Sequence, residues 1–222
     1  TSGPKIAEAS VARRDALRLL AGFKKFRERY FDREHSVYKD RLSGGQTPKT
    51  LIIGCSDSRV DPAIVTNASP GEIFVIRNVA NLVPPYDLTG GFHGVSAAIE
   101  FAVADLKVES IVILGHRQCG GIRALMLNQQ RPAGFVHQWM SIAVDAKRRV
   151  LAKHKGADPE TLCRHGEMES IVVSLRNLRT FPFVQEAIRD RNLSILGIYF
   201  DLEKGELCEY DEDEASFKTL DL

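Results

Sequence analysis

The 222-residue sequence has few cysteines, almost no net charge and no long hydrophobic run. Its four cysteines are too few for a disulfide scaffold, so a reducing compartment with metal-binding Cys and His is expected. Thirty Lys and Arg residues balance 29 Asp and Glu residues, which indicates neither a nucleic-acid partner nor an anionic membrane surface. No apolar run approaches the roughly 18 residues of a transmembrane helix. Residues 1–10 lack the apolar stretch of a signal peptide. We therefore expect a cytoplasmic protein, although an export signal upstream of residue 1 would leave no trace in this sequence.

The chain length and apolar fraction suit a single α/β domain over residues 1–222. Four continuous apolar runs predict strands buried on both faces: 50–54 ending at Cys55, 73–76, 110–114 ending at Gly115-His116, and 193–200. Apolar spacing predicts helices at 95–106, 120–129, 135–154 and 160–179. A last strand at 206–210 is expected at an edge. This alternation predicts a mostly parallel central β-sheet flanked by helices, with ligands at the carboxyl ends of its strands.

The first thirty residues have the pattern of a helix that needs a partner. Leu19, Phe23, Phe26 and Tyr30 recur at helical spacing among basic residues. An apolar stripe on a terminal helix must be covered by its own core or by another chain. We therefore expect residues 1–40 to form an N-terminal helical arm on an α/β core at 45–222, in a homodimer or a higher even oligomer.

Two short motifs follow two of the predicted strands. Cys55-Ser56-Asp57-Ser58-Arg59 follows the first strand, and His116-Arg117-Gln118-Cys119 follows the third. Each motif alone is weak evidence for a metal site, because a lone Cys after a buried strand is usually a small core residue. Together they offer two thiolates and one imidazole, a set suited to Zn²⁺. Three protein ligands with an open position are typical of catalytic rather than structural zinc.

Asp57 and Arg59 lie two residues apart and can enter the same pocket. Arg59 can hold the carboxylate through two hydrogen bonds, or Asp57 can bind the metal and exclude water. The alternative interpretation is an ordinary structural ion pair. Cys163 and Cys208 have no ligand-type pattern around them and are interpreted as structural.

Together with residues 77–81 (RNVAN) and Gly120-Gly121, these motifs resemble the signature of the β-class carbonic anhydrases. The resemblance is dense over about residues 45–125, and residues 81–87 resemble the plant-type branch. It implies one Zn²⁺ per chain, with Cys55, His116 and Cys119 as ligands and Asp57 and Arg59 as the catalytic dyad. It also implies a substrate pocket built from an amide donor, Gln46, and apolar walls at Phe74, Val79 and Phe101. Phe74 would come from the partner subunit, and Phe101 stands where plant-type sequences carry Tyr.

The implied activity is reversible hydration of CO₂ to bicarbonate and a proton, by attack of a zinc-bound hydroxide. Two rival functions stay open: hydrolysis of CS₂ or COS on the same scaffold, and non-catalytic binding of zinc or bicarbonate. The presence of Asp57, Arg59 and Gln46 favours an enzyme. Some family members also bind bicarbonate in a second pocket, with a Trp at the position of Ile52 and an Arg at that of Arg77. Because isoleucine has no indole N–H, we expect this second pocket to bind bicarbonate poorly.

Overall fold

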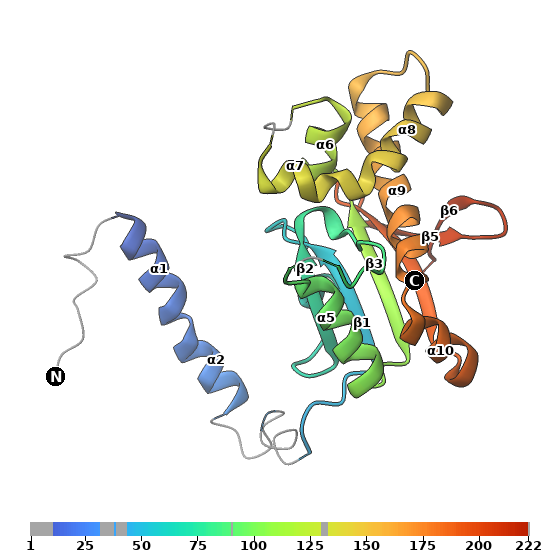
Figure 1. Ribbon diagram of the computed structural model, residues 1–222. Coiled ribbons are helices and arrows are strands. Elements are labelled where there is room, and N and C mark those ends of the chain that lie inside the picture. Colours follow the sequence, from blue (N-terminus) through green and yellow to red (C-terminus); the bar gives the residue numbers. More distant parts are fainter. Residues whose placement is uncertain (1–10, 32–37, 39–43, 90, 130–132, 222) are drawn as a thin grey trace. The chain divides into compact units, whose positions relative to one another are not determined.

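The computed structural model describes residues 11–31, 38, 44–89, 91–129 and 133–221 (Figure 1). The chain divides into two compact units, 1–46 and 47–222, and each is described by itself. The predicted arm therefore lies partly outside the described residues.

The described part of the N-terminal unit includes the short helices α1 (Val11–Ala21) and α2 (Phe23–Tyr30). The sequence predicted one continuous helix, but the structure interrupts it at Gly22, the N-cap residue of α2. Glycine lowers helix stability relative to alanine by roughly 1 kcal/mol, which favours a break at this position. The Phe26 ring contacts those of Phe23, Tyr30 and Tyr38, at centroid distances of 5.7, 5.1 and 5.5 Å. Phe23 nevertheless stays 62% exposed.

The larger unit is built on a six-stranded sheet in the order β2-β1-β3-β4-β5-β6. The strands are β1 (Thr50–Cys55), β2 (Ile73–Asn78), β3 (Ser110–His116), β4 (Ser194–Asp201), β5 (Glu206–Asp211) and β6 (Ser216–Thr219). The first four strands run parallel, and β5 and β6 continue antiparallel. The mostly parallel sheet with its C-terminal edge is thus confirmed, but β5, the strand expected at that edge, is covered on its outer side by β6, which the sequence pattern did not predict. Strands β1 and β3 are largely buried, whereas β2 lies at the opposite edge and is only partly buried.

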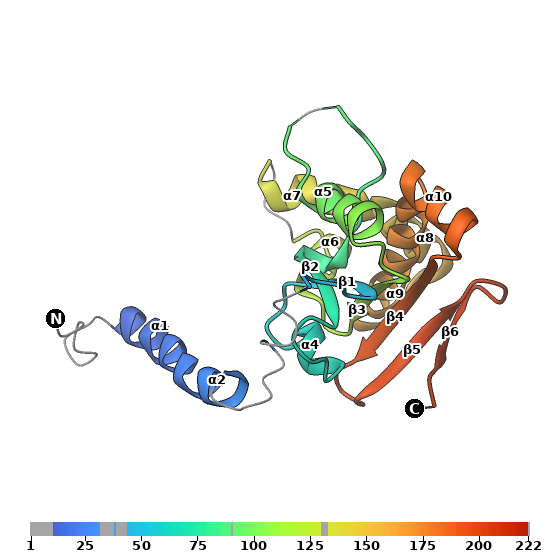
Figure 2. The ribbon, with the colours of Figure 1, turned by 90° about the horizontal axis from the view of Figure 1, so that it is seen from below.

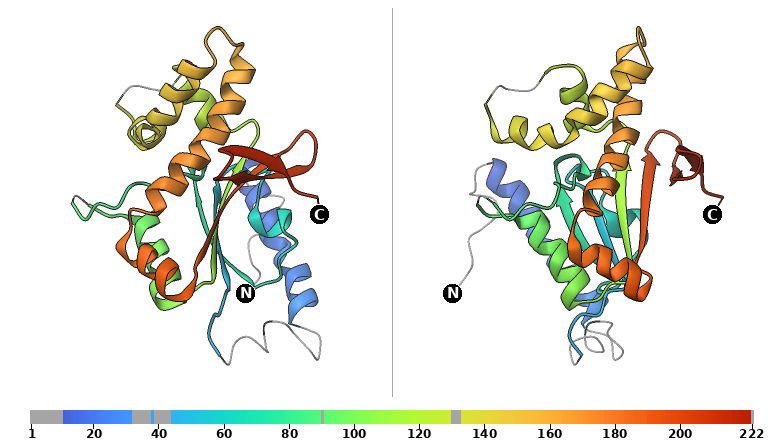
Figure 3. Two further views of the ribbon diagram at one scale, coloured as in Figure 1. Left: turned by 90° about the vertical axis from the view of Figure 1, so that its right-hand side faces the viewer. Right: turned by 45° about the vertical axis from the view of Figure 1, so that its right-hand side comes forward.

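Helices cover one face of the sheet and one of its ends. Figures 2 and 3 show α5 (Gly94–Glu100), α9 (Pro159–Leu178) and α10 (Pro182–Arg191) on one face. The other face carries the short α4 (Pro62–Val65). Three more helices gather at one end, in the upper part of Figure 1: α6 (Gly120–Met126), α7 (Phe135–Met140) and α8 (Val144–Lys153). The predicted helix at 135–154 is therefore two helices, joined by a short turn η4 (Ser141–Ala143). Among the described helices, none is both long and apolar enough to cross a bilayer.

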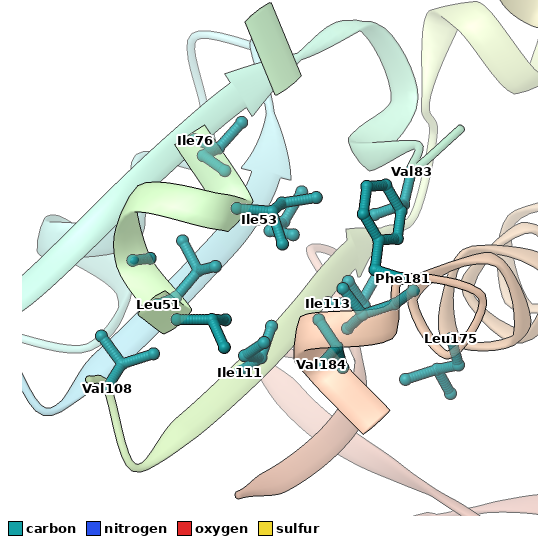
Figure 4. Packing of buried hydrophobic residues seen from close by; sticks show 14 of the residues in the cluster. Leu51, Ile53, Ile76, Val83, Val108, Ile111, Ile113, Leu175, Phe181 and Val184 are labelled. Atoms are coloured by element: carbon teal, nitrogen blue, oxygen red, sulfur yellow. The ribbon is translucent and has the colours of Figure 1, made fainter. Parts of the chain in front are cut away.

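The main core lies between the sheet and the helices α5, α9 and α10. Leu51, Ile53, Ile111 and Ile113 of β1 and β3 are fully buried there, with Phe181 (Figure 4). Burial of each such side chain contributes roughly 1.5–3 kcal/mol. A smaller cluster on the opposite face includes Ile52, Leu114 and Ile198.

Helix α9 approaches the sheet closely where two strands carry glycine. A Cβ atom at Gly115 would lie 2.6 Å from Cδ1 of Ile171, and one at Gly197 would lie 2.8 Å from Cγ2 of the same residue. These glycines therefore allow Ile171 of α9 to pack directly on the backbone of β3 and β4. Gly115 precedes His116, so this contact also determines how far α9 lies from the strand end that carries the second motif.

Candidate metal centre

The two motifs meet because β1 and β3 are adjacent parallel strands. Cys55 and His116 are the last residues of these strands, and Cys119 is the N-cap of α6. Their side chains are almost completely buried, with 6%, 1% and 1% exposed. One ligand atom from each lies within 4.8 Å of the others. These three residues therefore form a buried N/S cluster of a size that one metal ion can bridge.

The orientation of His116 fits metal binding. Its Nδ1 lies 2.8 Å from the backbone oxygen of Arg117, so Nδ1–H donates there and leaves a lone pair on Nε2. This Nε2 atom is buried and has no hydrogen-bond partner. A buried polar atom without a partner is costly, and a metal ion at the cluster would remove that cost. A backbone contact at the other ring nitrogen is the usual support of a metal-binding histidine.

The two thiols are hydrogen-bonded to each other, and their pKa values shift in opposite directions. A hydrogen bond from the Cys119 thiol lowers the pKa of Cys55 from 9.0 to about 4, with smaller contributions from His116 and from backbone N–H groups. The N–H of Asp57, 3.4 Å from Cys55 Sγ, is one of these backbone donors. The hydrogen bond to Cys55 and burial raise the pKa of Cys119, although the backbone N–H groups of Gly121 and Ile122, at the start of α6, lower it in part. The pair of thiols can thus lose protons to a cation, and the donor set suits soft divalent Zn²⁺.

Sequence reasoning missed a buried carboxylate behind Cys119. Oε1 of Glu167 accepts the Cys119 N–H at 3.0 Å, and Oε2 accepts the Tyr199 hydroxyl at 2.9 Å. Burial raises the pKa of Glu167 from 4.5 to about 7, and burial also raises that of Tyr199. Helical spacing in the sequence could have indicated the burial of Glu167, since it lies four residues from both Cys163 and Ile171 on the buried face of α9.

Asp57 and Arg59 form a two-point ion pair beside the cluster. Arg59 Nε donates to Asp57 Oδ1 at 2.9 Å, Nη2 donates to Oδ2 at 2.8 Å, and the Arg59 backbone N–H donates to Oδ1 at 3.0 Å. The Arg59 hydrogen bonds hold the pKa of Asp57 well below its usual range. Arg59 also donates to the side chain and backbone of Gln118, each at 3.2 Å. The carboxylate is therefore ionised and held on Arg59, the first of the two arrangements that the sequence allowed.

Arg77 stabilises the loop that carries this pair. Its guanidinium donates to the backbone oxygens of Cys55 at 2.9 Å and Asp57 at 2.6 Å, and to Asp61 Oδ2 at 2.8 Å. Ile52, at the other position of the suggested second bicarbonate pocket, is 3% exposed and packs in the smaller cluster. In this structure all three nitrogens of the Arg77 guanidinium thus donate a hydrogen bond within the protein itself.

The predicted pocket residues lie in different parts of the structure. Val79 is close to the cluster, because a Cβ atom on Gly121 would lie 2.9 Å from Val79 Cγ1. Phe74 pairs in register with Leu51, four residues before Cys55, which places it about 13 Å along the sheet from the strand end. The Phe101 ring contacts that of Phe74, with centroids 6.0 Å apart and planes inclined by 41°, so it also lies at the distant end. Gln46 belongs to the N-terminal unit, and its role stays a prediction.

The two remaining cysteines take no part in this cluster. Cys163 is buried in α9 and Cys208 is partly buried in β5; both are free thiols. Their interpretation as structural residues stays a prediction.

Comparison with known proteins agrees with this geometry. A family model described as carbonic anhydrase matches residues 50–207. β Carbonic anhydrase 3 of Arabidopsis thaliana is 38% identical over 206 residues, which are 91% of this chain and 78% of that protein. The crystallised β-carbonic anhydrase CcaA is 35% identical, with a TM-score of 0.85 over 93% of this chain and 100% of its own. A structure from a study of two tetrameric β-carbonic anhydrases of Sordaria macrospora is 32% identical, with a TM-score of 0.67 over 88% and 93% of the two chains. The resemblance in the motifs is thereby confirmed, and the chain belongs to the β-class carbonic anhydrase family of enzymes.

Proposed function

We propose that this protein catalyses the reversible hydration of CO₂ to bicarbonate and a proton, with one Zn²⁺ held by Cys55, His116 and Cys119. The observation that carries the proposal is the unpartnered Nε2 of His116 within a buried N/S cluster, next to a carboxylate held on Arg59. Zinc in such a site supplies hydroxide from water near neutral pH. With two thiolate ligands the metal is a weaker Lewis acid, so that water is expected to ionise above the value of about 7 seen with three histidines.

Asp57 orients the attacking oxygen. Since it is ionised and held on Arg59, it can accept a hydrogen bond from a hydroxide and direct the remaining lone pair toward carbon. Arg59 keeps the carboxylate available for this role and prevents it from taking the fourth ligand position. Glu167 positions Cys119 through its backbone N–H. Each of these residues acts on geometry that is fixed before substrate arrives, which reduces the cost of reaching the transition state.

The substrate pocket is proposed to be shared between two subunits. CO₂ is apolar, so an apolar pocket wall favours its binding. Val79 provides such a wall beside the metal centre of the same chain. Phe74 lies about 13 Å along the sheet from Cys55 and contacts Phe101, which supports the proposal that both rings serve a partner's pocket. Gln46 is proposed to donate to the developing negative oxygen. Phe101 offers no hydroxyl there, so any polar contact made by the plant-type Tyr would be absent.

This arrangement requires self-association. The exposed apolar residues Val75 and Phe101 at the β2 edge and the aromatic stripe on α2 support a homodimer or a higher even oligomer. The tetramers of Sordaria macrospora are consistent with it. Light scattering on the purified protein tests it: an active monomer of 24.7 kDa would contradict the shared pocket.

Regulation by a second bicarbonate is not expected. Ile52 has no donor, and the Arg77 guanidinium is engaged by Cys55, Asp57 and Asp61. Activity should therefore fall hyperbolically, by product inhibition, as bicarbonate is added. A sigmoidal loss of activity would overturn this part of the proposal.

The direct test is stopped-flow CO₂ hydration with a pH indicator. Activity should disappear when zinc is chelated and return when one equivalent of zinc is added back. Parallel assays with CS₂ and COS distinguish the rival hydrolase activity from CO₂ hydration. Stoichiometric zinc with no CO₂ hydration above the buffer rate would overturn the proposed function and favour the non-catalytic alternative.

A further inference from the structure

A second polar cavity lies away from the metal centre, between α8, α9 and the β5–β6 hairpin. It has a volume of about 300 Å³, and no residue of the metal cluster or of the Asp57–Arg59 pair lines it. Helix α8 contributes Arg149, Lys153 and His154, and α9 contributes His165 and Arg176. The two α9 residues lie eleven positions apart on one face of the helix, which corresponds to three turns. Five basic side chains from two packed helices thus converge on one small cavity.

The positive charge of this cavity is only partly neutralised. Its single lining carboxylate, Glu169, pairs with Arg149 Nε at 2.5 Å. Within the described residues, Lys153 and Arg176 have neither an ion-pair nor a hydrogen-bond partner. Three permanently cationic side chains therefore face one carboxylate. Tyr210 also lines the cavity.

Two histidines stack inside this wall. The rings of His154 and His165 have centroids 3.8 Å apart and planes inclined by 13°. Burial lowers the pKa of His165, and the nearby His154, Arg164 and Lys153 lower it further. Two protonated rings at this distance repel each other unless an anion lies beside them. A bound anion would favour the protonated form of His165 and would itself bind more tightly at lower pH.

We propose that this cavity, the α8–α9 cavity, is a binding site for a phosphate group, held by Lys153, Arg176 and the stacked His154–His165 pair. Phosphate is favoured because a tetrahedral phosphate anion accepts several hydrogen bonds from Lys, Arg and imidazolium donors at once. The volume admits free phosphate or a small phosphate monoester. A long polyanion is disfavoured, because the whole chain has a net charge of only +1.

Titration calorimetry on the full-length, zinc-loaded protein tests this proposal. The probes are inorganic phosphate and glycerol 3-phosphate, each added at constant ionic strength in chloride at pH 6 and pH 8. We expect saturable binding that is tighter at pH 6. Chemical shifts of the two imidazole rings should move with the same saturation. Tighter binding of glycerol 3-phosphate would indicate a monoester ligand, and equal binding would indicate phosphate itself.

A matched pair of variants separates a site from general charge attraction. Lys153→Gln combined with Arg176→Gln removes two of the free donors, and binding should weaken at least about tenfold, as loss of two charge-assisted hydrogen bonds implies. Lys155→Gln combined with Arg148→Gln removes the same charge from exposed positions outside the cavity and should change binding by less than about twofold. Absence of saturable binding to the wild-type protein, or an equal loss in both double variants, would overturn the proposal.

Discussion

The ion pair between Arg59 and Asp57 provides the most direct test of the proposed mechanism. The structure joins them by two side-chain hydrogen bonds, at 2.9 and 2.8 Å, and by one backbone hydrogen bond at 3.0 Å. Arg59→Ala removes the two side-chain bonds and keeps the third. Less free energy then holds the Asp57 carboxylate away from a cation at the neighbouring Cys55. We expect the carboxylate to take the fourth ligand position and to exclude water.

The size of the expected free-energy change follows from the number of Arg59–Asp57 hydrogen bonds that are lost and from their exposure to solvent. A hydrogen bond between charged groups contributes roughly 1.5–3 kcal/mol. The Arg59 side chain is 49% exposed, so solvent screening reduces this to about 1 kcal/mol for each bond. Loss of both shifts the balance between the two positions of Asp57 by about 2 kcal/mol, a factor of roughly 30. Arg59→Lys keeps the charge but only one donor direction, so it should fall between the wild-type protein and Arg59→Ala.

The assay combines rate and metal coordination. Stopped-flow hydration should show kcat/KM reduced about 30-fold or more in Arg59→Ala, at unchanged zinc content. Absorption of the cobalt-substituted protein should report a changed ligand set, which a merely structural role of Arg59 would not produce. Arg123→Ala is the matched control, because Arg123 is exposed on α6 near Arg59 and has no ion pair among the described residues. If Arg59→Ala keeps more than about a third of the wild-type kcat/KM and an unchanged cobalt spectrum, the two-position argument fails.

Three further outcomes follow from the structure. Cys119→Ser replaces a thiolate ligand by a hydroxyl and should lose most of its zinc by metal analysis; full zinc and activity would place the site elsewhere. Gly115→Ala inserts a methyl group 2.6 Å from Ile171 and should lower the free energy of unfolding by about 1–3 kcal/mol in urea. Part of that loss should be recovered when Ile171→Val is added, and strictly additive effects would contradict the contact. Asp158→Ala removes the α9 N-cap, whose pKa is lowered by the side chain and N–H of Thr161. It should lower Tm at pH 7, and the difference should shrink as the pH falls through the lowered pKa of that carboxyl, since only the ionised form gains from these bonds. A difference that grows in acid would refute this explanation.

The sequence by itself determined the parallel part of the sheet and the three residues of the buried N/S cluster. The apolar runs of β1 to β4 are strong local signals, and Cys55 and His116 stand directly at the ends of two of them. A parallel sheet brings neighbouring carboxyl ends together whatever the details of the connections. Asp57 and Arg59 lie two residues apart in one loop, so their pairing also needed little beyond local geometry. Residues close in sequence to a predicted strand end could therefore be placed without coordinates.

Tertiary structure decided the contacts between residues distant in sequence. Glu167 reaches Cys119 across 48 positions, and its partner Tyr199 comes from β4; no local pattern links these three. Lys153 and Arg176 approach one cavity only because α8 packs against α9. The edge strand β6 and the break at Gly22 were missed because four half-exposed residues and a single glycine are weak local signals. Such features depend on which surfaces meet when the chain is compact, and that is decided by packing energies summed over the whole molecule rather than by any one segment.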